Sequence, residues 1–196
     1  MSLARYLSKL GALLNSDGKV PSGALASGAA RANFGAGAVL QVVSATKTDT
    51  TSGTNLMSSG SWANVLQASI TPSSSSSKIL IFYSISFSCS NANGDASVPA
   101  RLVRGATAIC VGDAAGSRNQ VTSGQQWASG RSDMYGVHSH NFLDSPATTS
   151  STTYSVQLAG RGTGTGTWYC NRNYDDANST EGSRSTSTIT LMEIAQ

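Results

Sequence analysis

The hydrophobic pattern of the chain changes near residue 38. Before that point, leucines recur at a four-three-four spacing, which places them on one side of a helix of about four turns. They are Leu3, Leu7, Leu10 and Leu14. A helix this short is marginal alone in water, so we expect its leucines to be buried against a partner surface. The sequence leaves three such surfaces open: another protein, copies of the same helix, or the chain's own β-domain.

Turn residues at positions 15–18 and Pro21 end the helical pattern. Residues 22–37 are small and rich in Gly and Ala, as is typical of a linker. We therefore predict a short N-terminal α-helix with an extended linker over residues 1–37, which we call the leader. A β-domain is predicted over residues 38–196.

Beyond the leader, apolar and polar residues alternate with the period of two that marks half-buried strands. In the segment 78–90, every second residue from Ile79 to Cys89 is apolar, and serines fill the other face from Ser84 on. We expect water or a partner to cover that serine face. The other predicted strands are 38–46, 64–71, 133–143, 154–158, 167–170 and 186–194, with a hairpin over 101–111. This series predicts an all-β fold, an antiparallel sandwich or jelly roll.

The net charge of +3 at pH 7 is carried entirely by the leader. The β-domain has equal numbers of basic and acidic residues, so it lacks the basic stripe of a nucleic-acid-binding face. No apolar run is long enough to span a membrane as a helix. Three cysteines, Cys89, Cys110 and Cys170, lie in separate strand-like segments without metal-site spacing. Buried free thiols are favoured over a single disulfide.

Catalytic patterns are weak. The sequence has no Gly-x-Ser-x-Gly turn, and the glycine-rich segment 160–166 lacks the lysine of a phosphate-binding loop. The adjacent carboxylates Asp175 and Asp176 diverge on an extended chain and so make a poor acid-base pair. We expect no enzyme activity and no cofactor.

His138 and His140 are two residues apart, so on a strand their imidazoles share one face and could reach one metal ion. The sequence offers no firm third ligand, which favours surface or hydrogen-bonding roles for both histidines over a metal site.

Aromatic residues give the better functional hypothesis. Several lie in or beside predicted loops, next to Asn, Asp and Arg side chains, and this combination suits sugar rings. The predicted glycan-binding residues are Trp127, Trp168, Tyr169, Arg172, Tyr174 and Asp175. The alternative is that these rings fill the ends of the sandwich or a subunit interface.

Several segments, taken together, resemble a group of bacteriophage virion proteins, mostly small tail-fibre or surface-fibre subunits. The matching stretches are residues 38–43, 70–81, 101–105, 142–149, 153–157 and 190–194, in the order such proteins show. The leader also resembles the N-terminal virion-attachment segment of phage fibres. The resemblance implies a trimeric, jelly-roll-like head without enzyme activity. Some phage fibre tips bind metal through His-x-His pairs, which is what residues 138–140 would correspond to.

These observations predict a short tail-fibre subunit of a phage virion. The leader would attach it to another virion protein, and the β-domain would recognise host-surface glycan, with assembly in the host cytoplasm and no membrane insertion. One alternative is a capsid cement, decoration or head-fibre protein with a purely structural role. Another is a free-standing sugar-binding module.

Overall fold

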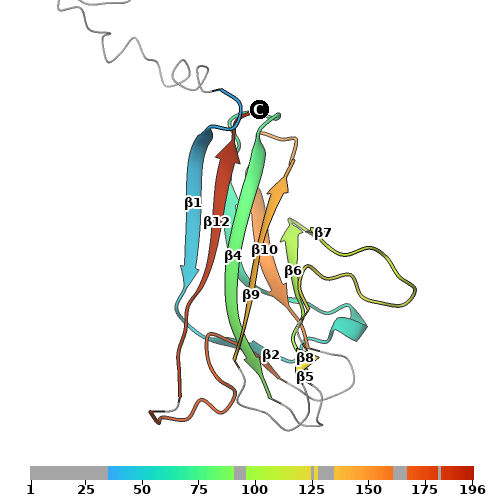
Figure 1. Ribbon diagram of the computed structural model, residues 1–196, viewed down its shortest axis with the longest axis vertical. Helices are drawn as coiled ribbons and strands as arrows, with labels where there is room; N and C mark the ends of the chain where they lie inside the picture. Colours follow the sequence, from blue (N-terminus) through green and yellow to red (C-terminus); the bar gives the residue numbers. More distant parts are fainter. Residues whose placement is uncertain (1–34, 91–95, 125, 128–134, 161–166, 181) are drawn as a thin grey trace, which may run out of the picture.

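The computed structural model describes residues 35–90, 96–124, 126–127, 135–160, 167–180 and 182–196. The predicted leader helix and its four leucines lie outside the described residues, so the helix stays a prediction. The described chain is all-β, with two main antiparallel sheets, as expected. The strands run along the long axis of an elongated sandwich (Figure 1).

The first sheet is built around one long strand, β4 (Lys78–Cys89). One edge of β4 pairs with β12 along its first half and with β11 near its end, while β9 pairs along the other edge. The sheet is extended by β1 beyond β12 and by β2 beyond β11. The bounds of these strands are β1 (Val39–Lys47), β2 (Thr51–Gly53), β9 (Gly136–Asp144), β11 (Trp168–Cys170) and β12 (Ser187–Ile194).

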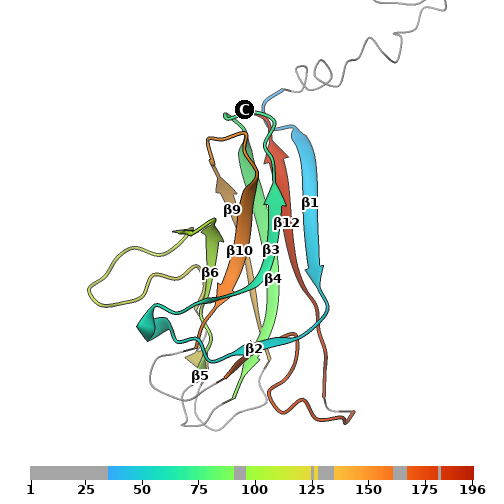
Figure 2. The ribbon, with the colours of Figure 1, turned by 180° about the vertical axis from the view of Figure 1, so that it is seen from behind.

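The second sheet has the order β3-β10-β6-β7 and lies behind the first in Figure 1 and in front of it in Figure 2. Its strands are β3 (Ala63–Ile70), β10 (Thr152–Leu158), β6 (Ala100–Arg104) and β7 (Thr107–Ile109). A two-stranded ribbon of β5 (Ala96–Ser97) and β8 (Gln126–Trp127) and a short 3-10 helix, η1 (Met57–Ser59), complete the described elements. Each predicted strand and the predicted hairpin is present, with shifts of up to three residues at the ends.

The core fills the space between the two sheets. The apolar face predicted for β4 points inward, and its Ile79, Ile81, Ile85 and Phe87 are fully buried. Branched side chains of the second sheet, such as Val156 of β10, pack against them. Each such side chain stabilises the fold by about 1.5–3 kcal/mol relative to leaving it in water.

The serine face of β4 differs from the expectation. Ser86 and Ser88 are buried, and the segment that follows β11 covers them. The Ser88 hydroxyl donates to the carbonyl of Arg172 (2.7 Å), and the Ser187 hydroxyl accepts from the amide of Ser86 (3.0 Å). The small hydroxyl side chains therefore make room for the chain's own backbone, not for water or a partner.

The sandwich has two distinct ends. At one end, Val39 of β1 pairs with Ile194 of β12, beside the first described residue and the C-terminus. We call it the leader end. At the other end, Lys47 pairs with Ser187, and residues 171–186 form the loop that joins β11 to β12. We call this segment the distal loop; it lies about 30 Å from the leader end, the length of a nine-residue strand.

Candidate recognition surface

The distal loop starts at a buried asparagine. Asn171 is fully buried and adopts φ 63°, in the left-handed region that Asn tolerates better than most residues. Its side-chain amide donates to the carbonyls of Lys47 (2.9 Å) and Asp49 (3.0 Å), and its carbonyl accepts from the Ser187 hydroxyl (2.6 Å). One side chain thereby joins three segments of the chain and fixes where the loop leaves the sheet.

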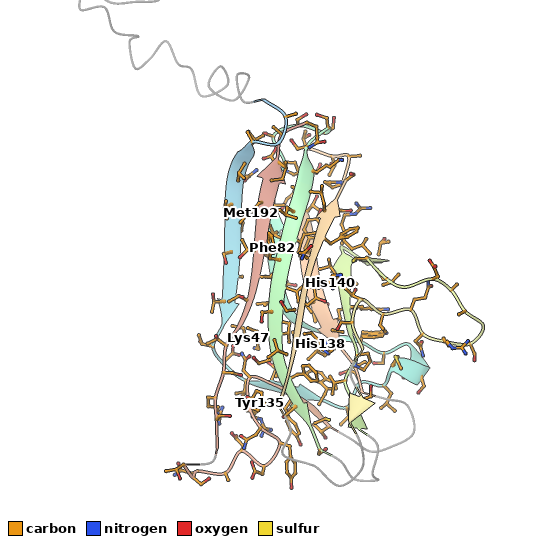
Figure 3. All side chains as sticks on the ribbon, in the orientation of Figure 1. Lys47, Phe82, Tyr135, His138, His140 and Met192 are labelled. Carbon is orange, nitrogen blue, oxygen red and sulfur yellow. The ribbon has the colours of Figure 1, made fainter. Side chains whose placement is uncertain are left out.

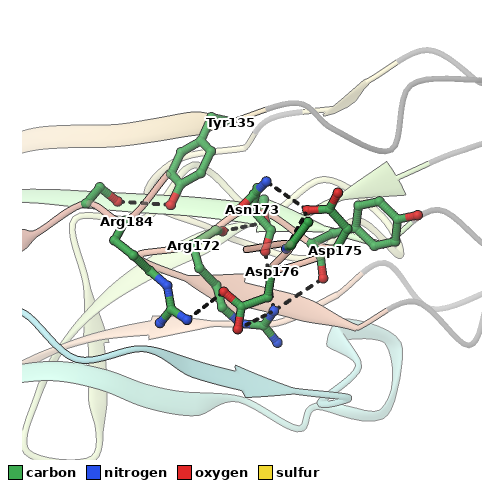
Figure 4. Close-up of polar contacts among 10 residues, drawn as sticks. Tyr135, Arg172, Asn173, Asp175, Asp176 and Arg184 are labelled. Atoms are coloured by element: carbon green, nitrogen blue, oxygen red, sulfur yellow. Dashed lines mark hydrogen bonds and ion pairs between the residues drawn. The ribbon is translucent and has the colours of Figure 1, made fainter. Parts of the chain in front are cut away.

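Beyond that point, one carboxylate organises the loop. Asp176 lies 2.6 Å from Arg184 Nη2 and 3.6 Å from Arg172 Nη1 (Figure 4). The Arg172 guanidinium also lies 4.1 Å above the centre of the Tyr169 ring and donates to the carbonyl of Tyr174 (3.2 Å). These contacts bring the two arms of the loop together, and residues 172 and 184 form an isolated antiparallel bridge.

The tip of the loop is shaped by its own polar groups. The Asn173 amide donates to Asp175 Oδ1 (2.8 Å). Gly182 lies so close to the chain that an added Cβ would be 2.5 Å from the carbonyl of Ala177, which favours glycine there. A hollow of about 360 Å³ opens among these residues. It is lined by Asn173, Asp176, Ala177, Asn178, Ser179, Gly182, Ser183 and Arg184.

The hollow offers hydrogen-bonding groups of both kinds. Amides and hydroxyls of Asn178, Ser179 and Ser183 can donate and accept, while the Arg184 side chain, 59% exposed, can donate. The two guanidinium groups of Arg172 and Arg184 are balanced by the two carboxylates of Asp175 and Asp176, so the described residues of the loop carry no net charge. A neutral, polyhydroxylated ligand matches this lining better than a charged one.

None of the six predicted glycan-binding residues lines the hollow, although three of them belong to the same loop. Arg172, Tyr174 and Asp175 belong to the distal loop, and Tyr169 lies under the Arg172 guanidinium. That guanidinium covers one face of the Tyr169 ring, so Tyr174, half-buried, is the better stacking surface. The side chain of Trp127 lies outside the described residues.

Trp168 corrects the sequence expectation of an exposed ring. The residue is 1% exposed and belongs to the core, because β11 pairs with β4 on one side and with β2 on the other. Its indole lies against Gly53, where any side chain would collide with it. Trp168 therefore supports the β11 strand from inside and offers no ring to a ligand.

Sequence reasoning missed Asn171, Asp176 and Arg184, which fix and close the loop. Asp176 and Arg184 are far apart in the sequence without a regular element between them, so no periodicity links them. The only sequence pattern that pointed to an ion pair here was the four-residue spacing of Arg172 and Asp176, a spacing at which opposite charges often pair on helices.

His138 and His140 both point toward the second sheet, and each has a partner (Figure 3). His138 is 2% exposed, stacks on Phe87 with ring centres 4.2 Å apart, and donates from Nε2 to the carbonyl of Val98 (2.7 Å). Its Nδ1 lies 2.7 Å from the Ser123 hydroxyl, which can donate to the neutral form of the imidazole. Burial lowers the pKa of His138 below its ordinary value, in agreement with this state.

His140 contacts a thiol. Its Nε2 lies 3.3 Å from Cys110 Sγ, at the open edge between β9 and β7. All three cysteines are free, as favoured by the sequence; Cys89 and Cys170 are buried, whereas Cys110 is partly exposed. Burial raises the pKa of Cys89 to about 12 and also raises that of Cys110, so neither thiol is activated at neutral pH.

Neither a metal-binding cluster nor a membrane-spanning helix is present among the described residues. They contain no group of three or more His, Cys, Asp and Glu side chains arranged to hold a metal ion. Within the same residues, no helix has both the length and the apolar character needed to cross a membrane.

Comparisons with known proteins leave the chain's family open. No protein-family model matches the chain, and no curated protein matches it either. Its function therefore has to be argued from the distal loop, the two ends of the sandwich and the sequence.

Proposed function

We propose that the protein is a structural subunit of a bacteriophage virion, a short tail fibre that recognises host-surface glycan through its distal loop. The leader attaches the subunit to another virion protein by its leucine side. The β-domain forms a jelly-roll-like head that works as a homotrimer. In this proposal the protein is located on the virion and is assembled in the host cytoplasm.

The observation that carries the proposal is the separation of the two ends. The described chain begins at Gly35 beside the C-terminus, where Gly37 donates to the carbonyl of Ala195 (2.9 Å). The polar hollow lies at the opposite end of β12. A subunit anchored by residues 1–37 therefore presents its loop away from the anchor, which is what an attachment fibre requires.

The chemistry of the hollow supports glycan as the ligand class. Sugar hydroxyls both donate and accept hydrogen bonds, and the lining of amides, hydroxyls and one exposed guanidinium can satisfy them. Tyr174, the neighbour of the lining residue Asn173 in the sequence, is half-buried and would offer its ring to the C–H face of a sugar.

A glycan array tests the recognition function directly. The full-length chain should bind a subset of printed bacterial surface glycans, and the double variant Asn178→Ala, Ser179→Ala should bind them at least tenfold more weakly. The matched control, Ser117→Ala with Asn119→Ala, removes the same groups from an exposed loop elsewhere and should bind as the wild type does. Equal binding by both double variants would show that the hollow is not the glycan site.

Anchoring is tested separately in infected cells. The variant Leu7→Asp, Leu10→Asp should fold normally but be missing from purified particles, because charge on the leucine side opposes its burial. Normal incorporation of this variant would overturn the attachment role of the leader.

A capsid decoration protein is the second candidate, and one observation favours it. The outer face of the first sheet exposes apolar side chains that could lie on a capsid surface. Particles without a decoration protein would adsorb to cells normally but burst at lower temperature, whereas particles without a fibre would fail to adsorb.

A further inference from the structure

The outer face of the first sheet is unusually apolar at its leader end. Val42, Phe82 and Leu143 are 55%, 42% and 45% exposed, on three different strands. We call this area the apolar patch, and its members are Val39, Val42, Leu80, Phe82, Leu143, Met192 and Ile194. Figure 3 labels two of them, Met192 and Phe82.

Strand register turns these residues into continuous rows. Val42 pairs with Met192, Met192 with Leu80, and Leu80 with Leu143, so one apolar row crosses four of the six strands of the sheet. In the next row toward the distal end, Phe82 lies beside Ser44, Thr190 and Asn141, and the row after it carries hydroxyls only, from Thr46, Thr188, Ser84 and Ser139. Across these three rows and the first row at the leader end, Lys78 is the only charged residue.

The outer face of the second sheet has the opposite character. There the polar side chains hydrogen-bond to one another across strands: Arg101 Nε donates to Gln157 Oε1 (2.6 Å), and Gln157 Nε2 donates to Asn64 Oδ1 (2.7 Å). A face covered by hydrogen-bonded polar side chains is suited to contact with water. On the outer face of the first sheet, a cross-strand hydrogen bond joins Ser44 Oγ to Thr190 Oγ1 (3.1 Å), but the large apolar side chains of the patch beside it are exposed, which marks a face that another surface covers.

We propose that copies of this chain cover that face: three chains pack the outer faces of their first sheets toward a common axis that runs along the strands. This inference rests on the proposed homotrimer and names the surface that forms it. The face is almost free of charge and carries hydroxyls that both donate and accept, so it needs no partner of opposite charge and can pair with itself.

The area and the leader favour copies of the chain over other occupants. Four strands and four rows give a face of about 500 Å², short of the roughly 800 Å² that each partner contributes to a stable interface. The described chain also begins at this end, so the 34 residues before Gly35 start beside the patch in each copy, and they are the part of the chain available to supply the rest of a stable interface.

Two single substitutions in the full-length chain test the proposal. Val42 and Val137 are the same residue type, are 55% and 56% exposed, and both point outward from the first sheet. Val42 belongs to the apolar row, whereas Val137 pairs with Ser86 near the distal end. Light scattering at micromolar concentration should give a trimer for the wild type and for Val137→Lys. The Val42→Lys variant places three like charges close together near the axis and so weakens the trimer. On dilution, it should dissociate at a protein concentration roughly 100-fold higher than the one at which the wild type does.

The outcomes separate this inference from the proposed function. A monomeric wild type would overturn the inference. The patch would then be covered by something other than copies of the chain, such as its own leader or a capsid surface. Equal association of Val42→Lys and Val137→Lys would overturn the inference as well. Glycan binding by a monomeric wild type would leave the recognition function intact, while a trimer without glycan binding would support the interface and contradict the recognition function.

Discussion

Each end of the sandwich contains one buried polar side chain that collects several hydrogen bonds, yet the two ends are built differently. At the leader end, Glu193 is fully buried and accepts from Gln41 Nε2 (2.6 Å), the Ser73 amide (2.7 Å) and the Ser73 hydroxyl (2.6 Å). At the distal end, Asn171 bonds to Lys47, Asp49 and Ser187. Glu193 joins regular strands to a turn, whereas Asn171 marks the start of an irregular loop.

The difference separates fold from function. Beyond Asn171 the hollow is lined by the loop's own residues, and the Asp176 ion pairs lie within the loop. Changes at the tip should therefore leave the sandwich intact, while changes at Asn171 or Glu193 should reach the core. The consequence is that the tip of the distal loop can vary in sequence while Asn171 and the sandwich beneath it stay the same.

The largest expected effect is at the base of the distal loop. Asn171→Ala leaves two part-buried carbonyls and the buried Ser187 hydroxyl without their partner and places alanine at φ 63°. We expect the free energy of unfolding to fall by about 3–4 kcal/mol, measured by urea denaturation. Asn173→Ala, the neighbouring control, should cost about 1 kcal/mol or less. Equal losses in the two variants would remove the distinction between base and tip.

A smaller loss is expected at the leader end. Glu193→Gln keeps the shape of the side chain but replaces the carboxylate with a neutral amide. One of the two accepting oxygens becomes an NH2 group, which donates and cannot accept. The free energy of unfolding at neutral pH should fall by about 2 kcal/mol in urea denaturation. No loss would mean that the buried carboxylate does not stabilise this end.

The same residue should give the leader end a pH dependence. Burial pushes the pKa of Glu193 upward, but hydrogen bonds from Ser73, Gln41 and Ser77 outweigh it and bring the pKa below the ordinary value of 4.5. As pH falls, the unfolded chain therefore takes up the proton first, and stability present above pH 4.5 is lost below it. Urea denaturation from pH 6 to pH 3 should show a steeper loss for the wild type than for Glu193→Gln.

The smallest effect on stability is expected at the tip. Asp176→Asn removes both ion pairs, but Asp176 and Arg184 are well exposed, so the free energy of unfolding should change by less than about 1 kcal/mol. Glycan binding on the array should nevertheless weaken, because the two arginines are no longer drawn together. A loss of stability as large as that of Asn171→Ala would show that the tip and the sandwich are one unit.

The sequence predicted those features that depend on neighbours along the chain. The period-two pattern of β4 located the strand and its buried face correctly, since Ile79 and Phe87 point where the alternation places them. Pairing between distant segments was not readable. Trp168 was predicted in a short strand beside a loop, with its ring exposed, but its burial depends on β4 and β2, which pair with β11 on either side. Glu193 gave no sign of burial, because its partners are more than a hundred residues away.

The β1–β12 ladder has a mechanical consequence. The two strands are antiparallel and paired from Val39–Ile194 to Lys47–Ser187, with β1 at the edge of the sheet. A tether on residues 1–34 pulls on β1 along its axis, while a grip on the distal loop pulls β12 in the opposite direction. The ladder is then loaded in shear, so its hydrogen bonds share the force and must break together instead of opening one by one. A subunit held at these two points resists tension far better than one pulled at Gly37 and at the C-terminus, which lie side by side, because such a pull would peel the strands apart.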